Sequence, residues 1–231
     1  MRKSLLKLVA MLICSTSFVA NGGVVVESTR YLYKEGSREI SAQLDNKDDT
    51  PYLMKSWVEA SGTSTVSAFM VTPPLFRLEG KQKNTVRIFP NAHISSAAKD
   101  RDTLFYFNVM SIPPTNSDDA ESQNRLQLAV RHRMRLIYRP KAIQNLSVIE
   151  ESKKIKWRKN NGKITIENPT PFFIYFTSVK INGKEMVDNI PNIEAFESKQ
   201  ADLPAGITGG KVTWSVATEY GSAGPEYSSS I

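Results

Sequence analysis

Residues 125–139 read RLQLAVRHRMRLIYR, and apolar and basic side chains alternate along this stretch. The even-numbered positions hold Leu126, Leu128, Val130, His132, Met134, Leu136 and Tyr138, whereas most odd-numbered positions hold arginine. A period of two places alternate side chains on opposite faces of a β-strand. The stretch therefore predicts one long strand with an apolar face. From the pattern alone, the simplest interpretation is that this face packs on the core of its own domain.

Shorter strand-like runs, separated by turn residues, lie on both sides of this stretch. They include Val24–Val26, Tyr31–Tyr33, Glu39–Leu44, Met54–Val58, Ser67–Val71, Thr85–Phe89, Leu104–Val109, Lys163–Glu167, Phe172–Val179 and Val212–Ala217. Pro73-Pro74 and Pro113-Pro114 fall between runs, where a missing N–H group does not interrupt a β ladder. Asn182-Gly183 is typical of a tight hairpin. Because no long amphipathic helical pattern is evident, the sequence predicts an all-β fold of the sandwich type.

The length of the chain accommodates two such domains. Its 231 residues exceed one immunoglobulin-like sandwich of about 100 residues and suit two of them. Pro140 ends the alternating stretch, and the mixed residues that follow it are expected to link the domains. We therefore expect one domain at residues 23–143 and a second at residues 144–231.

Residues 1–22 are expected to form a secretory signal peptide. Arg2, Lys3 and Lys7 give a basic start, an apolar run from Leu8 to Ile13 follows, and small residues lead to an expected cleavage after Gly22. The apolar run is shorter than the ~20 residues that cross a bilayer, and an uncleaved membrane anchor is the alternative. Cleavage also removes Cys14, which is the only cysteine, so the exported chain must be stabilised by its cores alone.

The charge of the exported chain argues against a nucleic-acid partner. Without the three cations of the signal, 27 basic residues face 23 acidic ones, a net charge of +4. A nucleic-acid-binding protein normally carries more positive charge, concentrated in one patch.

Catalysis is also not expected. The exported chain offers no cysteine nucleophile or thiolate metal site, and His93 and His132 lie far apart in the sequence. No zinc-protease, nucleophile-elbow or phosphate-binding loop motif occurs, which leaves no evident route to ATP use. We therefore expect no metal, no cofactor and no enzymatic activity.

Several short motifs, in their order along the chain, resemble those of periplasmic pilus (fimbrial) assembly chaperones of the chaperone–usher pathway. The motifs are Arg30 after Glu27-Ser28-Thr29, Thr72-Pro73-Pro74, Leu104-Phe105-Tyr106-Phe107-Asn108, Ile112-Pro113-Pro114, Leu136-Ile137-Tyr138-Arg139-Pro140 and Asn168-Pro169-Thr170-Pro171. This resemblance implies two immunoglobulin-like sandwiches set at an angle, with a cleft between them.

The resemblance also implies a function for the alternating stretch. Pilus subunits are sandwiches that lack their last strand, and the chaperone adds a strand of its own to the gap. Leu126, Leu128 and Val130 would be the side chains that it inserts. The competing interpretation, in which these three side chains pack inside their own domain, stays open at this point.

A basic pair is implied at the end of this strand. In the family, a basic residue near the start of the chain and a lysine in the long strand hold the C-terminal carboxylate of the subunit, and the matching positions are Arg30 and Arg135. Arginine stands here in place of lysine, and its planar fork differs in geometry from a compact ammonium group. Arg133 is a nearby substitute for Arg135.

The family further implies an ionic network between the domains, which matches Asp102, Arg139 and Glu219. Both acidic residues differ in length from the common family pattern, in which glutamate comes first and aspartate second. The expected role of this network is to hold the angle between the domains.

The implied partners are pilus subunits and an outer-membrane usher, and the implied location is the periplasm. Self-association of the free protein, which would cover its exposed strand, is left open. The alternative from another class is a secreted immunoglobulin-like adhesin or a structural pilus-associated protein. It shares the fold but does not require the basic pair beside an alternating strand.

Overall fold

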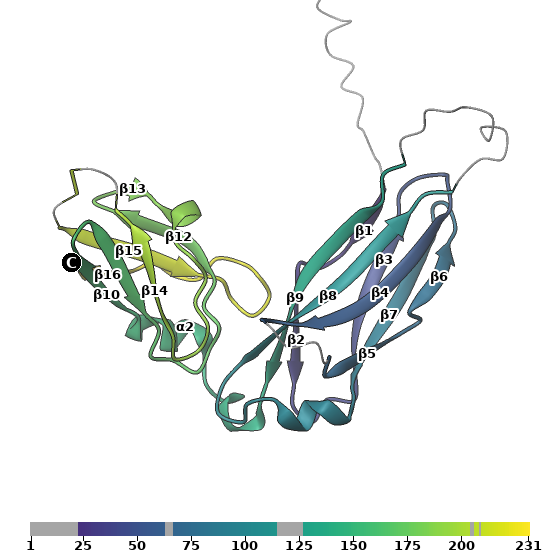
Figure 1. Cartoon of the computed structure of the whole chain (residues 1–231), viewed down its shortest axis with the longest axis horizontal. Coiled ribbons are helices and arrows are strands. Elements are labelled where there is room, and N and C mark those ends of the chain that lie inside the picture. The colour runs from purple at the N-terminus through teal and green to yellow at the C-terminus, as the bar shows by residue number, and fades with distance from the viewer. Residues whose placement is uncertain (1–22, 63–66, 115–126, 204–205, 208) are drawn as a thin grey trace, which may run out of the picture.

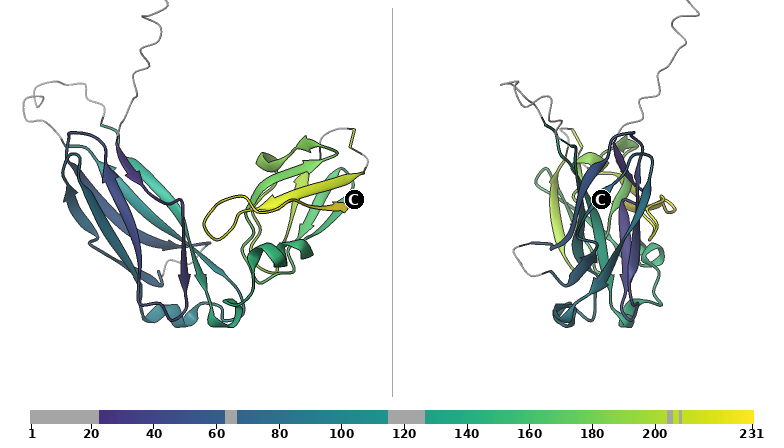
Figure 2. Two further views of the ribbon diagram at one scale, coloured as in Figure 1. Left: turned by 180° about the vertical axis from the view of Figure 1, so that it is seen from behind. Right: turned by 90° about the vertical axis from the view of Figure 1, so that its right-hand side faces the viewer.

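The computed structural model describes residues 23–62, 67–114, 127–203, 206–207 and 209–231. Its strands lie in two domains that meet at an angle, as the two arms in Figures 1 and 2 show. We name the part that holds β1–β9 domain one and the part that holds β10–β16 domain two. The predicted all-β fold of two sandwiches is confirmed.

Domain one contains two packed sheets. A four-stranded sheet has the order β1-β3-β7-β5, and a five-stranded sheet has the order β2-β9-β8-β4-β6. The strands are β1 (Val24–Val26), β2 (Arg30–Lys34), β3 (Ile40–Asn46), β4 (Tyr52–Ala60), β5 (Phe69–Thr72), β6 (Leu75–Leu78), β7 (Lys83–Pro90), β8 (Thr103–Ile112) and β9 (Val130–Arg139), with the short helix η1 (Ala92–Ser96) between β7 and β8.

Domain two also contains two sheets, in the orders β10-β11-β14 and β13-β12-β15-β16. Its strands are β10 (Lys156–Asn160), β11 (Lys163–Glu167), β12 (Phe176–Ile181), β13 (Lys184–Glu185), β14 (Ser198–Asp202), β15 (Lys211–Val216) and β16 (Tyr227–Ser230). The short helices η3 (Lys141–Ile143), α2 (Val148–Glu151) and η4 (Ser152–Lys154) follow β9, and η5 (Val187–Asn189) follows β13.

Each domain has its own hydrophobic core, as alternating strands require when they bury one face. The core of domain one includes Phe107, Leu136 and Tyr138, and the core of domain two is centred on Trp157 and Trp214. The expected hairpin joins β12 to β13: Asn182 and Gly183 both adopt positive φ angles, 50° and 81°. Asparagine and glycine tolerate this backbone better than other residues.

One crossover in domain one positions the functional residues. The chain begins in one sheet as β1, changes to the other sheet, and continues as β2 beside β9. β2 runs parallel to β9, and its first residue, Arg30, lies opposite Arg135. β8 pairs with β9 on the other side, from Thr103 opposite Tyr138 to Ser111 opposite Val130.

The predicted long strand is shorter than the sequence pattern indicated. β9 begins at Val130, and residues 127–129 are not part of a strand. The pairing with β8 stops at Ser111, and Pro113 and Pro114 follow the end of β8 without N–H groups to donate. Residues 127–129 therefore have no neighbouring strand from this chain in the described structure.

Candidate functional site

The two halves of β9 differ in what covers their edge. β2 pairs with residues 135–139 only, so we call Arg135–Arg139 the closed half and Val130–Met134 the open half. Along the open half, no strand of the described structure pairs with the edge that faces away from β8. Its backbone N–H and C=O groups on that side can therefore pair with a strand from another chain.

The apolar side chains of β9 divide in a similar way, except that Met134, the last residue of the open half, is 5% exposed and packs in the core of domain one. On the closed half, Leu136 and Tyr138 are 0% exposed, whereas Val130 is 52% exposed on the open half and Leu128, just before it, is 68% exposed. The interpretation in which these side chains pack inside domain one is therefore wrong for Leu128 and Val130. Leu126 lies outside the described residues.

Arg30 and Arg135 lie side by side at the junction between the two halves. They are opposite each other in the parallel β2–β9 pair, and neither forms an ion pair with a described carboxylate. Arg30 Nη1 donates a hydrogen bond of 2.8 Å to the carbonyl oxygen of Thr218 in domain two. Burial and the neighbouring Arg135 charge lower the pKa of Arg30 below its ordinary value. Guanidinium groups bind carboxylates and other anions through charge-assisted hydrogen bonds, and no described carboxylate occupies that role for this pair.

Both guanidinium groups also contact one aromatic ring. Cζ of Arg135 lies 4.3 Å from the ring centre of Tyr175, and Cζ of Arg30 lies 5.2 Å from it. Sequence reasoning missed Tyr175 because no motif marks it. The available signal was the alternation of side chains along this stretch. Ile174 and Phe176 are buried, so position 175 between them faces away from the core.

Arg133 is engaged elsewhere on the sheet. Its Cζ lies 3.4 Å from the ring centre of Tyr106, and its Nε lies 3.8 Å from Glu59. Beside it, Arg131 stacks on Trp57 at 5.1 Å and donates to both carboxylate oxygens of Glu59. These contacts leave Arg135, rather than Arg133, next to Tyr175.

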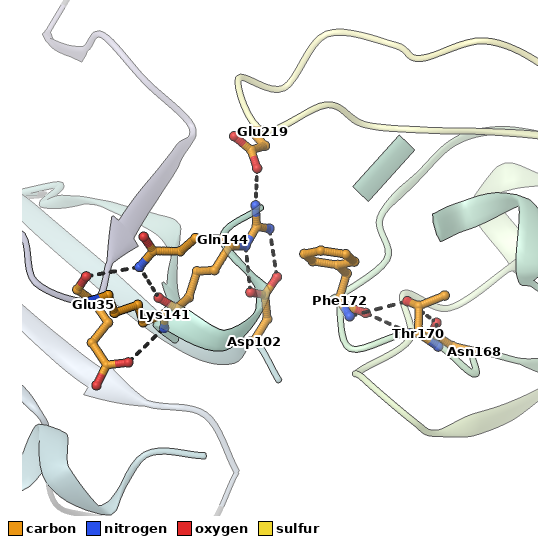
Figure 3. A network of polar contacts seen from close by, with 9 residues as sticks. Glu35, Asp102, Lys141, Gln144, Asn168, Thr170, Phe172 and Glu219 are labelled. Atoms are coloured by element: carbon orange, nitrogen blue, oxygen red, sulfur yellow. Dashed lines mark hydrogen bonds and ion pairs between the residues drawn. The ribbon is translucent and has the colours of Figure 1, made fainter. Parts of the chain in front are cut away.

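Arg139 pairs with Asp102 of domain one and with Glu219 of domain two, and Figure 3 labels the two carboxylates. Nε and Nη2 of Arg139 each donate to Asp102 at 3.0 Å, and Nη1 donates to Glu219. The Arg139 and Asp102 side chains are only 3% and 1% exposed. Burial raises the pKa of Asp102, and the paired Arg139 guanidinium opposes that shift.

The Asn-Pro-Thr-Pro motif at 168–171 prepares the domain-two side of this network. The buried Asn168 side chain donates to the carbonyl of Phe172 at 2.8 Å and accepts from the Thr170 hydroxyl at 2.7 Å. The turn presents Phe172 (Figure 3), and the centre of its ring lies 4.5 Å from Cζ of Arg139. The carbonyl of Pro171 accepts from the backbone N–H of Asp102 at 2.8 Å. The motif is therefore part of the contact between the domains.

Hollows beside the basic pair are lined by residues from both domains. One of about 410 Å³ is lined by Arg30 and Tyr31 together with Glu219 and Tyr220 of domain two. Another of about 430 Å³ is lined by Arg135 of β9 and by domain-two residues that include Tyr175. Within the described ranges, no group of His, Cys, Asp and Glu side chains has the arrangement of a metal site. The helices of that part of the chain include none long and apolar enough to span a membrane.

The chain has the architecture of a two-domain, immunoglobulin-like protein that leaves part of one strand open beside a basic pair. Residues 23–144 match the model of the N-terminal domain of pili and flagellar-assembly chaperones of the PapD type, and residues 150–228 match the model of the PapD C-terminal domain. The chain belongs to this family of pilus-assembly chaperones, whose members are periplasmic proteins without enzymatic activity.

Individual relatives agree with this assignment. The chain is 34% identical over 203 residues to the chaperone protein FocC of Escherichia coli, with 86% of each chain covered. It is 35% identical over 219 residues to the probable fimbrial chaperone ElfD of Escherichia coli O157:H7, covering 94% of this chain and 91% of ElfD.

Solved structures of similar proteins show the same architecture. A chain in the complex of Salmonella enterica SafA pilin with the SafB chaperone has a TM-score of 0.81 and 28% identity, and covers 91% of this chain and 97% of its own length. The Escherichia coli chaperone DraB has a TM-score of 0.79 and 31% identity, with coverages of 90% and 96%.

Proposed function

We propose that this protein binds pilus subunits in the periplasm by adding the open half of β9 to the incomplete sheet of the subunit, and then delivers the subunit to an outer-membrane usher. The observation that carries the proposal is a strand whose free edge and exposed apolar side chains lie directly beside two arginines without a carboxylate partner. The pairing of a similar chain with a pilin in a solved complex supports it.

The apolar side chains supply the first part of the binding energy. Leu128 and Val130, and Leu126 before them, would enter the groove that the missing strand leaves in the subunit. Burial of each Leu or Val side chain contributes about 1.5–3 kcal/mol. The open backbone groups of β9 gain hydrogen-bond partners in the same step, which also removes the aggregation hazard of an exposed apolar edge.

The basic pair supplies the second part. Arg30 and Arg135 would hold the C-terminal carboxylate of the subunit through charge-assisted hydrogen bonds, each worth about 1.5–3 kcal/mol. A fixed carboxylate also sets the register of the added strand, which an alternating pattern needs because a shift by one residue reverses its faces. The contacts of Asp102, Arg139 and Glu219 would hold the angle between the domains, and so keep the site open to the subunit.

The proposal also includes the boundaries of the signal peptide and of the two domains. Residues 1–22 would be removed as a signal peptide during export, domain one would span 23–143, and domain two would span 144–231. Mass spectrometry of the protein from a periplasmic extract tests the cleavage after Gly22 directly.

Co-expression with a pilus subunit from a neighbouring gene tests the binding. We expect wild type to yield a soluble one-to-one complex, Leu128→Glu to yield none, and Arg30→Ala and Arg135→Ala each to weaken the complex about tenfold or more. Leu75→Glu and Arg158→Ala are the matched controls, because both side chains are exposed and neither is on β9 or a strand next to it: Leu75 is on β6, at the far edge of the sheet, and Arg158 is on β10 of domain two. Controls that impair the complex as strongly as the β9 and anchor variants would contradict the proposal.

A further inference from the structure

Two arginines from domain one converge on a single ring of domain two. Arg30 and Arg135 are neighbours across a parallel strand pair, and their guanidinium carbons lie 5.2 and 4.3 Å from the ring centre of Tyr175. The contacts cross from domain one to domain two, because Tyr175 comes just before β12.

Two cations held this close repel each other, and partial burial strengthens that repulsion. Burial and the Arg135 charge together lower the pKa of Arg30. Two groups of domain two compensate the positive charge: the negative face of the Tyr175 ring and the carbonyl oxygen of Thr218, which accepts from Arg30 Nη1 at 2.8 Å.

The ring also favours arginine over lysine at position 135. A planar guanidinium can stack on an aromatic face and still direct several N–H donors sideways, whereas an ammonium group is a compact and strongly hydrated charge. No described carboxylate pairs with either arginine; Asp188 lines the same hollow as Arg135 and Tyr175 without forming an ion pair with Arg135. The guanidinium groups therefore keep donors for an incoming anion.

We propose that Tyr175 is a specificity-determining residue of the carboxylate site: it holds Arg30 and Arg135 together as a preformed receptor for a chain-terminal carboxylate, and it is the reason that arginine stands at position 135. This inference rests on the proposed function, because it concerns the same site. It adds that the receptor is assembled from both domains.

The loop after β15 connects this receptor to the contact between the domains. Thr218 accepts from Arg30, and the next residue, Glu219, accepts from Arg139. One short segment of domain two therefore holds both the anchor arginine and the interdomain arginine. The angle between the domains and the geometry of the carboxylate receptor depend on the same few residues.

A peptide with the sequence of the last strand of a co-encoded pilus subunit is the probe, prepared once with a free C-terminal carboxylate and once as the amide. Binding is measured by calorimetry for wild type, Tyr175→Leu and Tyr175→Phe. We expect wild type to bind the peptide with the free carboxylate more tightly than the amide. Tyr175→Leu should bind the carboxylate peptide about five- to thirty-fold more weakly than wild type does, with no change for the amide. Tyr175→Phe should bind both peptides within about twofold of the wild-type affinity. Phe196→Leu serves as the control, because this domain-two ring is 47% exposed and lies over Arg101, at 4.8 Å, instead of over Arg30 or Arg135.

A second comparison separates stacking from a general effect on the fold. Arg135→Lys is expected to weaken carboxylate binding about three- to tenfold beside Tyr175, but by less than about twofold in the Tyr175→Leu background. Thermal unfolding checks that each variant is folded.

Three results would overturn the inference. If Tyr175→Leu retains the wild-type preference for the carboxylate, the ring has no part in the receptor, although the anchor stands. Equal costs of Arg135→Lys in both backgrounds would show that the ring does not select arginine. If wild type itself does not distinguish the acid from the amide, the proposed anchor fails, and the role of Tyr175 fails with it.

Discussion

The open and closed halves of β9 carry apolar side chains at the same parity but differ in what covers their edge. In the closed half, between β2 and β8, Leu136 is 0% exposed, whereas Leu128, at the same parity just before the open half, is 68% exposed. Hydrophobic alternation therefore shows that one face of a strand can be buried, but not whether the same chain or a partner buries it. That depends on whether a neighbouring strand of the same chain extends along the whole edge.

The boundary between the halves is set by β2. The chain leaves the sheet of β1 and joins β9 only at Arg30, so the first residue of β2 is also the first residue of the proposed anchor. A subunit strand can occupy the free edge only up to this point, because β2 occupies the edge beyond it. The proposed carboxylate site at this junction would suit a partner whose chain ends there.

The largest difference between the halves is expected for their arginines. Arg139 ends the closed half with its side chain 3% exposed, whereas Arg133 in the open half is 49% exposed. Arg139→Met leaves Asp102 as an unpaired buried carboxylate, so we expect the free energy of unfolding to fall by about 3–5 kcal/mol. Arg133→Met is expected to change it by less than about 1 kcal/mol. Urea unfolding of both variants measures these values.

A double replacement tests the cause. Asp102→Leu combined with Arg139→Met removes both buried charges, and we expect it to restore most of the lost stability. An Arg139→Met protein as stable as wild type, or a double variant no better than the single one, would show that the buried pair does not support the fold in this way.

Two leucines on the same strand face provide the next comparison. Leu136→Ala creates a cavity in the core of domain one, and we expect a loss of about 2–5 kcal/mol in the free energy of unfolding. Leu128→Ala removes an exposed side chain, and its effect on the free protein is expected to stay within about 0.5 kcal/mol. Unfolding of the isolated protein in urea measures both. Similar losses for the two leucines would mean that Leu128 is buried in solution, contrary to the open half described here.

The sequence predicted the periodic features of the fold well. Alternation identified β9 and its buried face, which carries Leu136 and Tyr138. Asn182-Gly183 identified the hairpin between β12 and β13 in domain two. It did not predict that β9 would begin at Val130, because that end depends on where β8 stops pairing. Nor did it show that the closed half begins at Arg135, since this follows from where β2 begins, about 100 residues earlier in the chain.

The functional residues also differ in how well the sequence predicted them. The resemblance to pilus chaperones named Asp102, Arg139 and Glu219, and the structure brings their side chains into contact. It named Arg30 and Arg135 but not Tyr175, which contacts both. Tyr175 belongs to domain two, and no motif in the sequence links it to the two arginines. The roles of these residues in subunit binding stay predictions until variants are tested.

The smallest expected effect concerns the end of the closed half. Just after β2, the Glu35 backbone N–H donates to the carbonyl of Arg139, and the Glu35 carboxylate accepts from the Lys141 backbone N–H at 2.8 Å and from Lys99 at 3.0 Å. These contacts, the Lys141 hydrogen bond first, hold the pKa of Glu35 below its ordinary value. The stabilisation by the carboxylate is therefore fully present above the pKa of the unfolded chain, and it is lost as the pH falls through the lower pKa of the folded protein.

Glu35→Gln measures this contribution. We expect the variant to unfold in urea with a free energy lower by less than about 1 kcal/mol at pH 7, because the carboxylate is partly exposed. The difference from wild type should shrink as the pH falls below the ordinary range of glutamate and then disappear, since both proteins are then neutral at this position. Subunit binding should not change, because the open half is untouched. A difference that persists in acid would instead assign the effect to the shape of the side chain rather than to its charge.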